Sequence, residues 1–137
     1  MHNRFAAAAG ALAIAVLAGC SSPQLPNPPA AGVTINGSSA LQTQAVHCTQ
    51  VQWAWTINIG DAGSGANVNI DTSGQAPSTT SVHIHNVGGF SGIYSQGNGD
   101  ADTRVSGVTF TITGTANGIH TETAEAASAQ YKIVARC

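Results

Sequence analysis

The chain has 137 residues, of which 42% are hydrophobic and only 7% are charged, against about 25% charged residues in an average soluble protein. Four Lys and Arg residues face six Asp and Glu residues, so the formal net charge is −2, which excludes the basic patch that nucleic-acid binding requires. The hydrophobic content also excludes charge-driven disorder, and the length fits one small domain.

The N-terminus has the pattern of an export signal. A single cation, Arg4, precedes an unbroken run of apolar or small residues from Phe5 to Ala18. This run is shorter than the roughly 20 residues of helix that a bilayer core requires. We therefore interpret residues 1–19 as a secretory signal peptide.

The signal peptide closes on Leu17-Ala18-Gly19-Cys20, which resembles the lipobox of bacterial lipoproteins. The resemblance implies that the signal peptidase recognises Leu17, Ala18 and Gly19 and cleaves before Cys20. It also implies that Cys20 carries a diacylglyceryl group and an N-linked acyl chain such as palmitate. Each buried methylene stabilises membrane binding by about 0.8 kcal/mol, so several chains make a durable anchor. We expect an exported protein, anchored by lipid to the outer face of the cell membrane or in the cell wall.

A proline-rich segment follows Cys20. Residues 21–31 contain four prolines and no charge, which favours an extended chain of about 3.1 Å per residue over a helix or a central strand. We expect residues 20–31 to form an acylated tether and residues 32–137 to form one folded domain.

Alternation of apolar and polar residues predicts β-strands throughout this domain. The first strand contains Val33 and Ile35, and Asn36-Gly37 predicts a hairpin turn, which also accounts for the formal glycosylation sequon at Asn36. About seven short strands predict a mostly β fold, either a single antiparallel β-sandwich or a half-open barrel. The strongest alternation places on one face of one strand Val51, Trp53, Trp55, Ile57 and Ile59; weaker ones cover residues 68–70, 82–84, 108–112 and 131–133.

Two segments differ from this pattern. Residues 122–129 are rich in alanine and predict a turn or two of helix. The glycine-rich residues 96–102 predict the most polar loop of the domain, and a mobile one.

The three cysteines predict one disulfide. Lipidation uses Cys20, so Cys48 and Cys137 remain as a possible pair, with two buried free thiols as the alternative. Outside the cytoplasm such a bond persists. Closing a loop of about ninety residues stabilises the fold by about 4 kcal/mol in the chain-entropy model.

Two pairs of residues are candidate metal ligands. His83 and His85 alternate with Val82 and Ile84, so both imidazoles point to one side of a strand, as in some zinc and copper sites. A third ligand would have to come from His47, His120 or a carboxylate, and two solvated histidines are the simpler interpretation. Asp100 and Asp102 could attract calcium, but their spacing fits no known calcium loop. We therefore expect no metal and no cofactor.

The sequence offers no complete catalytic motif. Gly89-Phe90-Ser91-Gly92 lacks the second glycine of a nucleophile elbow, because Ile93 stands in its place. Lys132 is the only lysine, and no Ser-x-x-Lys motif contains it. We expect that the protein is not an enzyme.

Several landmarks occur in order along the chain: the lipobox, Val33 to Gly37, the Cys48 strand, Asn58-Ile59-Gly60, Val108 to Gly118 and a closing strand that ends in Cys137. Together they resemble the mycobacterial 19-kilodalton lipoprotein antigen family. The family implies an envelope lipoprotein without enzyme activity, whose acylated N-terminus is recognised by Toll-like receptor 2 of the host. This chain differs from the family pattern in its tether, which is rich in proline and contains no threonine.

We expect this protein to act by display and contact, as a surface antigen recognised through the acyl chains on Cys20 and the neighbouring Ser21 and Ser22. The alternative is a lipid or glycolipid carrier, which would need an apolar cavity within the β domain.

Overall fold

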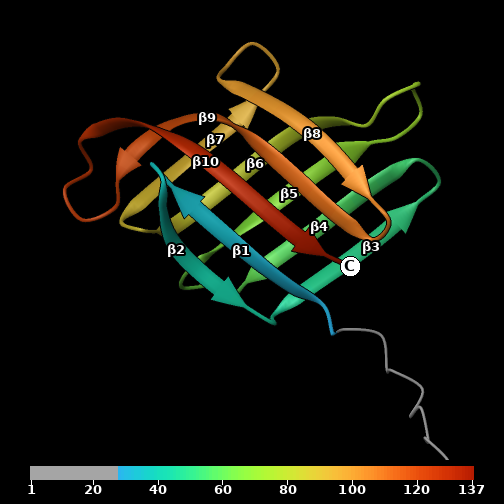
Figure 1. Cartoon of the computed structure of the whole chain (residues 1–137). Coiled ribbons are helices and arrows are strands. Elements are labelled where there is room, and N and C mark those ends of the chain that lie inside the picture. The colour runs from blue at the N-terminus through green and yellow to red at the C-terminus, as the bar shows by residue number, and fades with distance from the viewer. Residues whose placement is uncertain (1–27) are drawn as a thin grey trace, which may run out of the picture.

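The computed structural model describes residues 28–137, and this part of the chain forms ten β-strands and no helix (Figure 1). The mostly β fold is confirmed, with ten strands instead of about seven. The strands are β1 (Ala30–Ile35), β2 (Ser38–Thr43), β3 (Val46–Val51), β4 (Ala54–Gly60), β5 (Gly65–Asp71), β6 (Ser78–Val87), β7 (Phe90–Ser95), β8 (Asp100–Ser106), β9 (Thr109–His120) and β10 (Ala126–Arg136).

All strand pairs are antiparallel, and the strands form one sheet in the order β2-β1-β10-β9-β7-β6-β5-β4-β3. The long strand β9 pairs with β8 along its first part and with β7 along its last residues. The sheet curls until its two edge strands, β2 and β3, are joined by only two residues, Gln44 and Ala45. The result is a sheet that is nearly closed into a barrel-like shape (Figure 1).

The strand period of two explains the core. In β10 the side chains of Ala129, Tyr131, Ile133 and Ala135 are buried, whereas those between them face outward. The same alternation in the other long strands fills the interior with aliphatic side chains and few aromatic ones. The largest fully buried side chains are Ile57, Ile70, Ile84, Ile112, Ile133, Val33, Val68, Val82 and Val87.

The predicted continuous strand over residues 51–59 is wrong. The chain turns at Gln52, which has a φ of 53°, and the segment becomes the β3–β4 hairpin. Trp53 therefore lies in the turn and is 61% exposed, while Trp55 is half-buried with its ring centroid 5.1 Å from that of Phe110. Val108, which we also expected in a strand, lies in the β8–β9 turn.

The helix expected over residues 122–129 is also wrong. Residues 121–123 form a turn, Ala124 has a φ of 58°, and β10 begins at Ala126. The amide of His120 donates to the carbonyl of Glu125 at 2.9 Å, which closes the β9–β10 hairpin. Eleven paired residues of β9 and β10 outweigh the weak helical preference of a short alanine-rich segment.

The predicted loop over residues 96–102 is shorter than expected, because Asp100 already begins β8. At the N-terminal boundary, β1 begins at Ala30, two residues before the expected start of the domain. The signal peptide, and the tether as far as residue 27, lie outside the described residues. Within residues 28–137 no helix is long and apolar enough to cross a membrane.

Candidate functional site

The predicted lipidation site lies outside the described part of the chain, as do Leu17, Ala18 and Gly19. The point at which the tether joins the domain is nevertheless defined. Arg136 donates from Nε and Nη2 to the carbonyl oxygen of Pro28, at 3.1 and 2.8 Å, and Ala30 pairs with Arg136 in the sheet. The tether therefore joins the domain beside its C-terminus.

The predicted disulfide is confirmed. Cys48 in the edge strand β3 is bonded to Cys137, which directly follows β10, and the two Cα atoms are 5.9 Å apart. No strand pairing connects β3 with β10. The bond therefore links the β3 edge of the curled sheet to β10, the third strand from the β2 edge.

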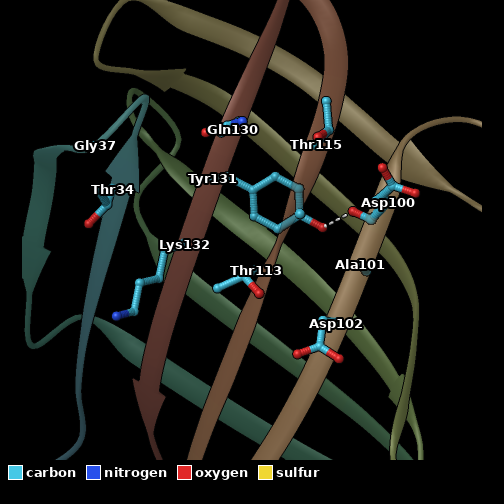
Figure 2. Close-up of a pocket in the computed structure, with 11 residues that line it drawn as sticks. Thr34, Gly37, Asp100, Ala101, Asp102, Thr113, Thr115, Gln130, Tyr131 and Lys132 are labelled. Atoms are coloured by element: carbon cyan, nitrogen blue, oxygen red, sulfur yellow. Dashed lines mark hydrogen bonds between the residues drawn. The ribbon is translucent and has the colours of Figure 1, made fainter.

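A surface groove with a volume of about 550 Å³ lies over β1, β10, β9 and β8 (Figure 2). The register of the strands determines which residues line the groove. Lys132 of β10 pairs with Thr113 of β9, and Thr113 pairs with Asp102 of β8. An ammonium group thus stands on one side of a threonine floor and the Asp100 and Asp102 carboxylates on the other (Figure 2). These groups can hydrogen-bond to a polar ligand.

Tyr131 lies beside this groove, and its hydroxyl donates to the carbonyl oxygen of Asp100 at 2.8 Å (Figure 2). Burial raises the pKa of Tyr131 well above its usual value, and the nearby Tyr94 and Asp100 raise this pKa further. The phenol therefore stays neutral and ties β10 to the start of β8, across β9.

The structure does not assemble a metal site from His83 and His85. Both lie on β6, where they pair with Asn67 and Gly65, and Nε2 of His85 lies 2.7 Å from the carbonyl oxygen of Asp61. Within residues 28–137 no group of three His, Cys, Asp or Glu residues could hold a metal ion. The suggested third ligands lie elsewhere, His47 on β3 and His120 at the end of β9.

The other candidate residues have structural contacts. Asp100 and Asp102 lie in strand β8 instead of a calcium loop. Asp102 lies 3.5 Å from Arg104 in an exposed ion pair. The Ser91 hydroxyl accepts a hydrogen bond from the Asn86 amide and shares another with Thr121, both at 2.8 Å.

Sequence analysis missed a polar network on the outer face of β4, β5 and β6. The Thr56 hydroxyl donates to Asn69 Oδ1 at 3.0 Å, and Asn69 Nδ2 donates to Ser81 at 2.9 Å and to Asn67 at 3.2 Å. Asn67 in turn donates to Asn58. The Asn-x-Asn spacing at 67 and 69 was the available signal, because two residues so spaced share one face of a strand.

An apolar cleft of about 400 Å³ surrounds the disulfide at the surface of the domain. Trp55 and Phe110 line it together with the two cysteines, and the β8–β9 hairpin contributes Val105 and Val108. Sequence analysis did not find this cleft, because its walls come from strands that are distant in the chain.

Comparison with known proteins identifies a family for the β domain. The model of the Mycobacterium 19 kDa lipoprotein antigen family matches residues 26–137. The chain belongs to this family. A candidate lipoprotein of Mycobacterium indicus pranii is 46% identical over 144 residues, with all of both chains covered. A candidate lipoprotein of Mycobacterium avium subsp. hominissuis is 43% identical over 141 residues, which covers this whole chain and 97% of the relative. Membership in the 19 kDa antigen family identifies an envelope-associated lipoprotein.

Proposed function

We propose that this lipoprotein is anchored to the outer face of the cell membrane by acyl chains on Cys20 and acts by display and contact instead of turnover. The observation that carries the proposal is the lipobox, Leu17 to Cys20, in a chain of the lipoprotein antigen family. Several acyl chains supply the free energy of membrane binding, which the weakly charged domain does not supply by electrostatic attraction.

The proposal includes recognition of the acylated N-terminus by a lipopeptide receptor of the host, Toll-like receptor 2. Such a receptor would bind the acyl chains and the first residues after them, Ser21 and Ser22. The β domain then serves as a stable carrier of this N-terminus. Its outward-facing polar surfaces remain available for contact.

Replacing the lipidated sulfur tests the proposal. Cys20→Ser should move the protein from the detergent phase to the aqueous phase in Triton X-114 partitioning and should abolish activation of cells that express the receptor. Ser21→Ala is the matched control, because it preserves the lipidated thiol and should keep the protein in the detergent phase. A Cys20→Ser protein that still enters the detergent phase and activates the receptor would contradict the proposal.

The apolar cleft favours one second candidate, a lipid carrier. The cleft lies at the surface, whereas aliphatic side chains fill the interior of the domain, so it could bind part of an acyl chain but not enclose one. Native mass spectrometry of the Cys20→Ser protein separates the two functions. Stoichiometric bound lipid would favour carriage, and a lipid-free protein would favour display.

A further inference from the structure

The most exposed large hydrophobic side chains lie together at one end of the domain. Val51 is 67% exposed, Trp53 is 61% exposed and Val108 is 60% exposed, and Val105 beside them is 41% exposed. They belong to the β3–β4 and β8–β9 hairpins, which lie on the right in Figure 1. We call this end of the domain, with its two hairpins and the β5–β6 loop, the tether end.

The tether joins the domain at this same end. In the sheet Ala30 pairs with Arg136, and Arg136 pairs with Thr109 at the β8–β9 hairpin. The Cys137 amide donates to the Val108 carbonyl at 2.9 Å, and Cys137 is bonded to Cys48 of β3. The start of β1, the C-terminus and the two apolar hairpins are therefore neighbours.

Charge is distributed unevenly between the two ends. The three connections at the tether end, residues 52–53, 72–77 and 107–108, contain no charged residue. Arg136 lies at this end, and Asp71 is the last residue of β5, beside the β5–β6 loop. Arg104 lies in β8, three positions before Gly107 of the β8–β9 turn, and pairs with Asp102 at 3.5 Å. The opposite end contains the connections with three acids, Asp61, Glu122 and Glu125.

The chain between the lipidated sulfur and the domain is short. Seven residues lie between Cys20 and Pro28, so eight residue-to-residue steps of at most about 3.6 Å span at most about 29 Å. An anchored Cys20 therefore keeps Pro28, where the tether joins the domain, within about 29 Å of the lipid surface. Trp at a membrane interface places its amphipathic ring at the level of the headgroups, and exposed valines gain from contact with the acyl boundary.

We propose that the tether end docks on the bilayer that holds the lipid anchor, with Trp53, Val51 and Val108 in the interfacial region. This inference rests on the proposed anchoring through Cys20. The acidic end then points away from an anionic lipid surface, and Arg136 lies at the end that faces it. The domain is thereby held in one orientation that presents its acidic end outward.

The test uses the acylated full-length mature protein in vesicles of phosphatidylcholine and phosphatidylglycerol with brominated acyl chains, which quench nearby tryptophan. The chain has two tryptophans, so Trp53→Phe gives the emission of Trp55 alone. We expect brominated lipids to reduce the emission assigned to Trp53 about twofold, because interfacial tryptophan lies within reach of the bromines. Adding Glu122→Trp to Trp53→Phe moves the reporter to the opposite end, where we expect no quenching.

A second variant preserves the reporter and removes the docking surface. Val51→Asp with Val108→Asp should abolish quenching of Trp53 while the protein still floats with the vesicles, and both sites are exposed enough to tolerate the change. Ile119→Asp, at the opposite end, is the matched control and should leave quenching intact. Unquenched Trp53 in the unsubstituted protein, when that protein floats with the vesicles, would overturn the docking but not the anchor. Acylated protein that fails to float would overturn both.

Discussion

Cys48 and Cys137 are joined by a disulfide that spans 89 residues of sequence and connects the edge strand β3 to the end of β10. The loop that it closes is long, so its removal should lower the free energy of unfolding by about 4 kcal/mol in the chain-entropy model. Urea unfolding of Cys48→Ser with Cys137→Ser measures this change. An unaltered midpoint, or two reactive thiols in the denatured non-reduced protein, would contradict the assignment.

The two tryptophans should differ in their contribution to stability. Trp55 packs against Phe110, so Trp55→Ala should lower the free energy of unfolding by about 3 kcal/mol. Trp53 is exposed in a turn, so Trp53→Ala should change it by less than about 0.5 kcal/mol. Thermal or urea unfolding of the two variants gives the comparison. Equal losses would mean that Trp53 is packed in solution.

These tryptophans also show where sequence reasoning succeeds and fails. The period of two correctly placed Trp55, Ile57 and Ile59 on the core side, because strand geometry fixes alternation locally. The alternation of apolar and polar residues continued through Trp53 by coincidence. The turn at Gln52, which has a positive φ, could not be predicted because no glycine, asparagine or proline marks it. A hairpin turn therefore cannot be predicted from alternation when the turn residues themselves continue it.

Some features of the candidate site were predictable from the sequence and others were not. Cysteine counting identified the Cys48–Cys137 pair, since one cysteine was assigned to lipid and two remained. The groove between Lys132 and Asp102 could not be found, because it depends on the register of β10 and β8 on β9. Residues 122–129 were wrongly predicted as helix because local helix preference is weak beside the long pairing of β9 with β10, which begins at Ala126.

Gly114 should be intolerant of any side chain. A Cβ atom there would overlap the carbonyl oxygen of Asp100 and come within 2.9 Å of the Tyr131 hydroxyl. Gly114→Ala should therefore separate β8 from β9 and lower the free energy of unfolding by about 1–3 kcal/mol. Gly74→Ala is the matched control, since its nearest neighbour would be 3.6 Å away. Equal unfolding midpoints for the two variants would contradict the packing at Gly114.

Tyr131 should make stability depend on alkaline pH. Burial raises the pKa of the folded-state phenol above its unfolded value near 10, so its contribution is complete below about pH 10 and is lost as the pH rises further. Tyr131→Phe removes this dependence and also a hydrogen bond worth about 1 kcal/mol at neutral pH. Urea unfolding of both proteins at neutral and alkaline pH tests the prediction. Parallel losses of stability in both would contradict it.

The intact mass of the protein purified from its own host's membranes tests the central claim most directly. The account predicts a polypeptide that begins at Cys20, carries the mass of a diacylglyceryl group and an acyl chain, and lacks the two hydrogens lost in the Cys48–Cys137 bond. A polypeptide that begins at another residue and carries no fatty acyl mass would contradict the account.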